Sequence, residues 1–356
     1  MMDQKGRETA PLIRFGKSYA DVWKIKTDFF EHNAEFLHEM DRVADIYRAQ
    51  PLRTGCKICE QAYNNALEFE SHGLQYFLCP HCGHLNGAYQ ETASFSKKVY
   101  EDMDYGHVYR GGETEYNKRM ETIYLPKAQF MIEALRETVS SDEIEKMRFL
   151  DVGAGSGYYV AAMQHLGLQA TGIEISAAQV EWGGKFLPSG SLIHLQDANI
   201  SERIRCADEQ VVSFIGVLEH IVDLQEVLQA LVENTSIKYI FFSVPMFSYS
   251  AIFESAHPNV FNRLLGGTHT HLFTNESLTW LMRQFQWELR GAWYFGTDIA
   301  DLVRMLMVES ETGGNTALND FFKNKVADIL DVLQMVIDRQ KFCSEVHMLV
   351  EKCKVG

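Results

Sequence analysis

The sequence predicts an α/β fold with an open, mostly parallel β-sheet, preceded by a small cysteine-containing module. The main observation is a regular alternation of strand-like and helix-like segments after residue 148, from "RFLDVGA" and "YYVAAMQHLG" to "NESLTWLMRQF" and "WELRGAWYF". Such alternation is typical of a sheet covered by helices on both faces. A glycine-rich turn after the first of these strands and two upstream CxxC pairs are the other two observations.

Composition narrows the classes of protein to consider. The chain has 356 residues, which suggests two or three folded units, and its net charge of −15 argues against a nucleic-acid partner. The N-terminus lacks an apolar signal segment and the chain has no run of 18 apolar residues, so we expect a cytoplasmic protein without membrane contact. Seven cysteines, four of them in CxxC pairs, favour a metal site over disulfides.

Four consecutive regions are expected along the chain. Apolar residues recur at helical spacing between 20 and 48, and Pro51 ends that helix. Short strands "LEFE" and "LQYFLC" connect the cysteine pairs. The predicted regions are a helical segment at 1–50, a four-cysteine module at 51–100, a Tyr-rich connector at 101–125 and an α/β domain at 126–356.

A helical insertion at 296–340 interrupts the alternation, and "SEVHMLVEK" follows it as the final strand. The second helical stretch carries an apolar stripe made of Phe322, Val326, Leu330, Leu333 and Ile337. Such a stripe packs either into the core of its own chain or against a second copy. Both interpretations, including a homodimer, remain open at this point.

The turn "DVGAGSG" places Gly153, Gly155 and Gly157 between a strand and a helix. Glycines there allow a tight turn and close approach of a ligand to the backbone, beside the free N–H groups of a helix N-terminus. Tyr158 replaces the third glycine of the dinucleotide-binding pattern. Asp151 would repel a pyrophosphate but attract a cofactor with an amine and a sulfonium.

Two further carboxylates follow the next strands. Glu174 ends the second strand, where it can hold a ribose diol, and Asp197 follows the third, where it can accept a hydrogen bond from an adenine amino group. The alternative is a structural glycine turn with unrelated surface acids.

These motifs resemble those of the class I S-adenosylmethionine-dependent methyltransferases over residues 126–356. The similar segments are "FLDVGAGSGYY", "GIEIS", "LQDANI" and "VLEHI". The resemblance implies a Rossmann-like, seven-stranded sheet whose glycine loop holds the methionine part of the cofactor. It implies these roles for Asp151, the three glycines and Glu174, with Asp197 at the adenine. The insertion departs from the family, whose members usually reach their last strand sooner.

The cysteine pairs follow the spacing C-x₂-C-x₁₉-C-x₂-C, which supplies four soft ligands for tetrahedral zinc. Four thiolates close the coordination shell, so the expected role is structural. A redox CxxC pair and an empty clip are the alternatives. Residues 51–100 contain four Lys or Arg and four Asp or Glu, so the module does not have the basic surface that is typical of nucleic-acid binding. The predicted ligands are Cys56, Cys59, Cys79 and Cys82.

Candidate catalytic residues follow the fourth and fifth strands, where open sheets bind ligands. Glu219 and His220 lie in "VLEHIVD", and a histidine there suits a general base, although the pair could instead cap the next helix or position the cofactor. His271, close to His269, could face the acceptor or could merely precede the helix cap at Thr274 or Asn275. Two connector tyrosines could cover the cofactor or pack as ordinary linker residues, namely Tyr105 and Tyr109.

A four-cysteine zinc module in front of such a domain resembles the sugar C-methyltransferases, which act on nucleotide-linked deoxysugars. It resembles more loosely the ribosomal-RNA guanine methyltransferases with a zinc ribbon. The first resemblance implies C- or O-methylation of a nucleotide-activated sugar, although the C-terminal tail here is shorter than in the sugar enzymes. An RNA base methyltransferase and a non-catalytic S-adenosylmethionine-binding scaffold are the alternatives.

Overall fold

An eight-stranded sheet lies at the centre of the molecule in the computed structural model, which describes residues 10–18, 32–63, 66–101, 111–196, 199–266, 268–327 and 329–353. The five strands β9, β8, β5, β6 and β7 run parallel, while β12 runs antiparallel between β9 and β11. In spatial order the strands are β1 (Leu12–Phe15), β11 (Trp287–Phe295), β12 (Glu345–Lys352), β9 (Tyr239–Pro245), β8 (Val211–Ile215), β5 (Arg148–Val152), β6 (Gln169–Glu174) and β7 (Leu192–His194). The predicted open, mostly parallel sheet is therefore confirmed.

The eighth strand, β1, corrects the predicted architecture. Leu12 pairs with Gly291 and Phe15 with Tyr294, so the N-terminal strand extends the sheet parallel to β11. The region 1–50 is thus not wholly helical. A four-residue strand is too short to show a pattern of its own, and it is held by the edge of β11. Of the helix predicted at 20–48, the described part is α2 (Asn33–Arg48), and residues 19–31 lie outside the described residues.

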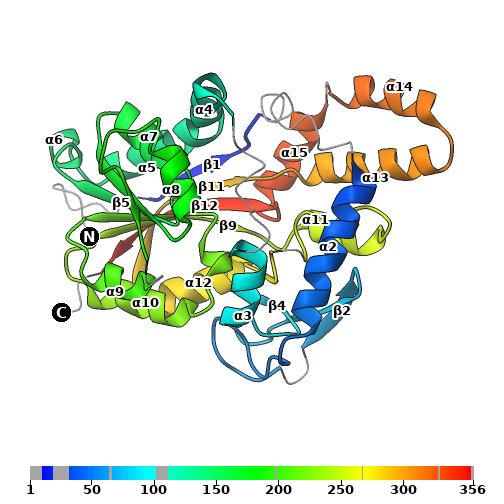
Figure 1. Cartoon of the computed structure of the whole chain (residues 1–356), viewed down its shortest axis with the longest axis horizontal. Helices are drawn as coiled ribbons and strands as arrows, with labels where there is room; N and C mark the ends of the chain where they lie inside the picture. The colour runs from blue at the N-terminus through cyan, green and yellow to red at the C-terminus, as the bar shows by residue number, and fades with distance from the viewer. Residues whose placement is uncertain are drawn as a thin grey trace.

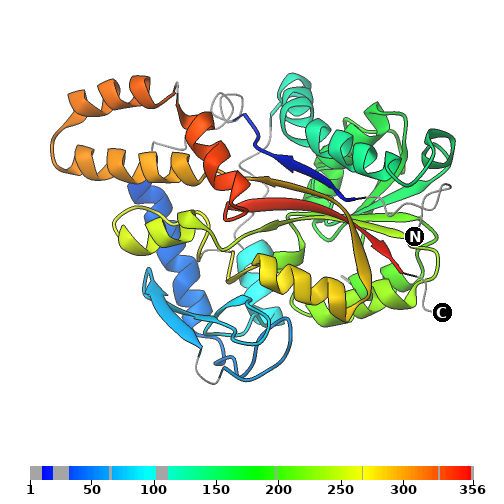
Figure 2. The ribbon, with the colours of Figure 1, turned by 180° about the vertical axis from the view of Figure 1, so that it is seen from behind.

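Helices cover both faces of the sheet, as Figures 1 and 2 show. Side chains alternate along β5, so that Leu150 and Val152 pack into one core cluster and Phe149 into the other. One face is covered by α4 (Glu113–Arg119), the π-helix η4 (Met120–Tyr124), α5 (Leu125–Arg136), α6 (Ser141–Ile144), α7 (Tyr158–His165) and α8 (Ala177–Gly183). The other is covered by α9 (Ile200–Arg205), α10 (Leu224–Glu233) and α12 (Asn275–Gln284).

A second, antiparallel sheet carries the cysteine pairs. Its strands are β10 (His271–Leu272), β4 (Leu85–Gly87), β3 (Leu74–Leu78) and β2 (Leu67–Ser71), and α3 (Ala93–Ser96) and the π-helix η2 (Lys97–Glu101) follow β4. Because β10 pairs with β4, residues from the α/β region complete this sheet. Tyr47 of α2 packs with Tyr76 and Leu272 in the same core. The four-cysteine module therefore folds against its neighbours on both sides.

The connector and the insertion both contain regular helices. Residues 113–124 form α4 and η4, which continue into α5, so the part of the connector that the structure describes is not an irregular linker. The insertion between β11 and β12 contains α13 (Asp298–Thr312), α14 (Thr316–Ala327) and α15 (Leu330–Arg339). Its first helix, α13, packs against α11 (Tyr249–Ala256), which precedes β10.

The apolar stripe predicted on one insertion helix is divided between two. Val326 of α14 and Leu330 of α15 are buried, whereas Leu333 is 42% exposed. Part of the stripe thus packs within the chain, and the homodimer stays a prediction. No helix in the described ranges has the length and apolar character needed to cross a bilayer.

Candidate active site and metal centre

The four predicted metal ligands lie together at the knuckles of the small sheet. The sulfur atoms of Cys56, Cys59, Cys79 and Cys82 all lie within 4.8 Å of one another. The Cys56–Cys82 and Cys59–Cys79 sulfur pairs are 3.5 and 3.6 Å apart. The hydrogen bond from Cys82 lowers the pKa of Cys56 to about 5, and the Asn86 amide approaches the same sulfur at 3.5 Å. This donor set fits a structural zinc ion, whose ligands are thiolates supported by neighbouring donors.

The cysteine cluster is packed directly against the helices of the large sheet. Cys56, Ile58 and Leu224 belong to one core cluster, and the side-chain amide of Gln225 donates to the backbone oxygen of Ile58. Leu224 and Gln225 begin α10, so the first cysteine knuckle and the segment after β8 support each other. A metal ion bound by the four cysteines would therefore support this part of the α/β domain as well.

The glycine turn has the backbone that its sequence predicts. Gly153, Gly155 and Gly157 have φ angles of 68°, 54° and 76°, in the region that favours glycine. A Cβ on Gly153 would lie 2.7 Å from the Val217 side chain, and one on Gly157 would lie 2.5 Å from that of Leu187. The turn can therefore not accept larger residues without moving its neighbours.

Glu174 joins this turn to the end of the next strand. Its carboxylate accepts the Gly155 N–H at 2.8 Å and the Ser176 N–H at 2.8 Å, and the residue is 8% exposed. Each carboxylate oxygen has a further lone pair, so two ribose hydroxyls could still be accepted. The position fits the ribose role that the family resemblance implies.

The other two predicted cofactor acids differ in what the structure shows. Asp151 is buried beneath the turn, where it accepts a 2.7 Å hydrogen bond from the Ser213 hydroxyl. Burial raises its pKa to about 7. Asp197 lies outside the described residues, as do Tyr105 and Tyr109.

An aromatic cluster lies beside the glycine turn, and the sequence pattern does not predict it. Tyr116 donates its hydroxyl hydrogen bond to the Ser156 backbone oxygen at 3.1 Å. Its ring stacks on Tyr158 and Phe186 with centroids 4.5 Å apart in each case, and Trp182 contacts the same group. Tyr116 belongs to the predicted Tyr-rich connector. Its contact with the glycine turn could have been predicted only from its position on the helix that the connector forms.

Glu219 and His220 lie on the 3₁₀-helix Leu218–His220, directly after β8, and a third residue joins them. Nε2 of His220 is 3.9 Å from Oε1 of Glu219, and the His269 ring stacks on that of His220 with centroids 5.2 Å apart. Ligand-type atoms of all three lie within 4.8 Å of one another, so the group could also hold a metal ion. Nδ1 of His269 is 3.2 Å from the Leu264 backbone oxygen, which fixes the ring.

Burial sets the protonation states of this group. It raises the pKa of Glu219 to about 8, and within the described part of the chain Oε2 of this residue has no hydrogen-bond partner. Burial, together with the neighbouring His269, lowers the pKa of His220 to about 3. The His220 side chain is still 26% exposed, so a ligand can reach it. At neutral pH the imidazole is therefore neutral.

His271, the third predicted catalytic residue, is placed differently. It is 1% exposed, and its Nδ1 lies 2.9 Å from Nε2 of His84 in the four-cysteine module. Thr274 caps α12 through the Ser277 N–H, as one of the two predicted caps. Of the two histidines before this helix, His269 lies beside His220, and a catalytic role for His271 stays a prediction.

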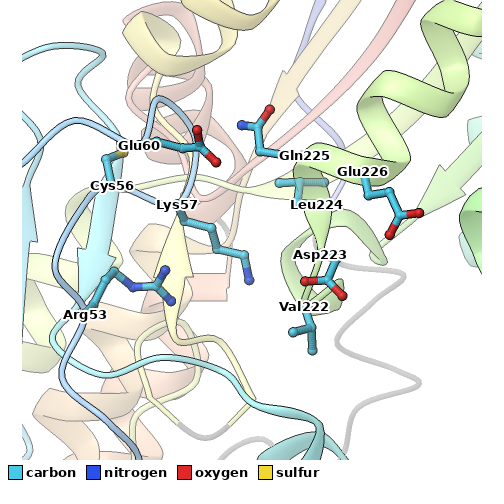
Figure 3. Close-up of a pocket in the computed structure, with 9 residues that line it drawn as sticks. All are labelled: Arg53, Cys56, Lys57, Glu60, Val222, Asp223, Leu224, Gln225 and Glu226. Atoms are coloured by element: carbon cyan, nitrogen blue, oxygen red, sulfur yellow. The ribbon is translucent and has the colours of Figure 1, made fainter.

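A pocket of about 390 Å³ lies between the four-cysteine module and the segment after β8 (Figure 3). One wall comes from the first cysteine knuckle and the other from the chain that follows Glu219 and His220. The lining residues are Arg53, Cys56, Lys57, Glu60, Val222, Asp223, Leu224, Gln225 and Glu226.

Replacing Glu219 by Gln should change how stability depends on pH. The folded chain holds the Glu219 proton up to about pH 8, whereas an unfolded glutamate loses it near its ordinary pKa of 4.5. Stability from this group therefore falls as pH rises between these values, by at most about 1.4 kcal/mol per unit. Urea unfolding would be measured at intervals across this pH range. The free energy of unfolding of Glu219→Gln should increase relative to that of the wild type as pH rises. Curves that stay parallel, as expected for the exposed control Glu145→Gln, would contradict the buried neutral carboxyl.

Comparisons with known proteins agree with this architecture. Residues 122–291 match the family model described as a methyltransferase domain. No curated protein matches the chain.

The chain also resembles solved structures at low identity. The magnesium protoporphyrin IX methyltransferase of Synechocystis PCC 6803, with bound SAH, is 10% identical, with a TM-score of 0.44, and the match covers 72% of this chain and 97% of that one. The plantazolicin methyltransferase BpumL, in complex with SAH, is 15% identical with a TM-score of 0.42, over 73% and 94%. A SAM-dependent methyltransferase from Archaeoglobus fulgidus is 17% identical with a TM-score of 0.39, over 71% and 100%.

The family match begins at η4 and ends in β11, so it includes the glycine turn, Glu174 and the Glu219–His220 pair. Together with the observed sheet and turn, it shows that this part of the chain has the α/β methyltransferase fold.

Proposed function

We propose that the chain transfers a methyl group from S-adenosylmethionine to a small-molecule acceptor, a nucleotide-activated sugar or a related carbohydrate intermediate. The observation that carries this proposal is the pocket between the four-cysteine module and the segment after Glu219 and His220. Its volume of about 390 Å³ is in the range of small-molecule sites. The net charge of −15 gives no general attraction for nucleic acid.

Different residues of the chain would bind the cofactor and transfer the proton. When bound, S-adenosylmethionine supplies a methyl group on a sulfonium sulfur. The turn at Gly155 and the carboxylate of Glu174 would hold the cofactor, and the neutral imidazole of His220 would accept the acceptor's proton. Once the pH exceeds its pKa of about 8, an ionised Glu219, 3.9 Å away, would stabilise the resulting imidazolium. The four-cysteine centre would keep the opposite pocket wall in place.

Replacing Glu174 by Ala should weaken cofactor binding. The change removes the proposed ribose contact and also the hydrogen bonds to the Gly155 and Ser176 N–H groups. Hydrogen bonds to charged groups contribute about 1.5–3 kcal/mol each, so we expect roughly a 10-fold to 150-fold rise in the S-adenosylmethionine Kd. Titration calorimetry measures this directly. An unchanged Kd would remove Glu174 from the cofactor site.

An acceptor screen tests the proposed substrate class. The purified full chain would be incubated with methyl-labelled S-adenosylmethionine and, separately, with a pool of nucleotide sugars and with total RNA. Mass spectrometry should find the label in a sugar nucleotide, and its position would distinguish carbon from oxygen methylation. Label in RNA would overturn the proposal in favour of an RNA base methyltransferase. Cofactor binding without transfer to any acceptor would favour a scaffold.

A further inference from the structure

We propose that Arg53 and Lys57 of the four-cysteine module form the subsite for the phosphate group of the acceptor, an inference that rests on the proposed function. Both residues flank a metal ligand, Cys56, and both line the pocket. Their role would be recognition of the acceptor rather than support of the metal alone. The four-cysteine module would then be the element that selects the substrate.

Arg53 and Lys57 share a buried carboxylate, and Asp223 on the opposite wall also attracts Lys57. Arg53 and Lys57 both bind the same oxygen of Glu91, Oε2, with the lysine nitrogen 3.1 Å away. The other Glu91 oxygen accepts the hydroxyl of Thr270. Burial alone would raise the pKa of Glu91, but Lys57 and Arg53 lower it to about 2, so it is ionised. One carboxylate thus serves two cations.

These charges are held almost entirely out of water. The side chains of Arg53, Lys57 and Glu91 are 11%, 4% and 7% exposed. Within the described residues, the buried Nε of Arg53 has no hydrogen-bond partner. A buried cation without full compensation is costly, and an anion from the ligand would relieve that cost. A guanidinium suits phosphate in particular, because its fork can bind two oxygens at once.

The pocket is polarised, which limits the ligands that fit. Figure 3 shows the charged ends of Arg53 and Lys57 extending from the knuckle toward the segment at Val222–Asp223. Asp223 interacts electrostatically with Lys57 at this end, whereas the carboxylates of Glu60 and Glu226 line other parts of the pocket. Carboxylates accept hydrogen bonds from hydroxyl groups but repel anions. The fitting ligand therefore has phosphate at one end and hydroxyls at the other, as a nucleotide-linked sugar does.

A different explanation must be separated by experiment. A zinc ion with four thiolates is itself negatively charged, so the two cations could serve only to balance the metal centre. That explanation predicts loss of metal or stability in variants, without any specific effect on phosphate ligands.

The test measures binding of UDP and of uridine to the zinc-loaded full chain by calorimetry, with S-adenosylhomocysteine present. Arg53→Gln and Lys57→Gln should each weaken UDP binding about 10-fold to 100-fold, since each loses a charge-assisted hydrogen bond. Uridine binding and zinc content should not change. Lys57→Arg should keep most of the UDP affinity. Arg42→Gln on the exposed face of α2 is the matched control.

Two results would overturn the inference. One is unchanged UDP affinity in both Gln variants, and the other is an equal loss for UDP and uridine. Glu91→Gln adds a check of opposite sign, because release of both cations should tighten UDP binding in a chain that remains folded and zinc-loaded. Methyl transfer to a phosphate-free sugar would keep the proposed function and reject this subsite. UDP binding without methyl transfer to any sugar nucleotide would keep this subsite and reject the proposed function.

Discussion

Replacing His220 by Asn should lower the rate of methyl transfer by about 10²-fold to 10⁴-fold, the usual contribution of a positioned general base. Asn has a similar size but cannot take up the acceptor's proton. The residue follows β8 and takes no part in the Glu174 carboxylate contacts, so cofactor affinity should not change. Single-turnover rates with saturating cofactor and acceptor measure this effect.

The control for this variant is His165→Asn, a substitution of an exposed histidine at the end of α7, which should retain the wild-type rate.

A pH profile of the rate adds a second readout. The wild-type rate should rise with pH as Glu219 loses its proton near its pKa of about 8, because the carboxylate favours proton uptake by His220. Glu219→Gln should lack that rise. A His220→Asn enzyme with full activity would exclude His220 as the base.

Replacing Cys79 by Ser should unfold the four-cysteine module and destabilise the region beside it. The three remaining thiolates cannot complete a tetrahedral shell, and structural zinc sites stabilise isolated peptides by about 10–16 kcal/mol. In the full chain, where other cores remain, we expect a loss of several kcal/mol. Because Cys79 shares a core cluster with Leu224 of α10, acceptor binding should be lost as well. Zinc content by elemental analysis and thermal unfolding measure both effects.

A matched cysteine separates the metal site from general effects of the substitution. Cys206 is exposed, and Cys206→Ser should keep one zinc per chain and an unchanged Tm. A chelator should reproduce the Cys79→Ser phenotype in the wild type. A wild-type chain that contains no zinc when purified from zinc-supplemented cells would contradict the metal assignment.

The large sheet was predictable from sequence because its strands are buried on both faces and read as apolar runs. β9 is buried along its whole length, and β5 is buried except at Arg148. The glycine turn was also predictable, since three positive φ angles in five residues need glycine. By contrast, β1 is defined by the edge strand that it joins, and its four residues carry no signal of their own.

The site was only partly predictable, because several contacts depend on how distant segments pack. The cysteine spacing indicated which sulfur atoms would meet, and the sheet pattern placed Glu219 and His220 at the end of β8. His269 joins them through a loop after α11, and no local pattern distinguished it from His271. The sequence also did not predict that Arg53 and Lys57 pair with Glu91 in the buried interior. Glu91 is 34 or more residues away from both of them in sequence.

Hydrogen exchange on the zinc-loaded full chain tests most directly whether the cofactor and the acceptor occupy one site between the methyltransferase sheet and the four-cysteine module. Exchange would be measured first with S-adenosylhomocysteine and then with UDP added. The cofactor product should protect the glycine turn and the end of β6, at 153–157 and 174–176. UDP should then protect the two pocket walls, at 53–60 and 222–226. Protection by UDP elsewhere, with both walls unchanged, would contradict a shared site.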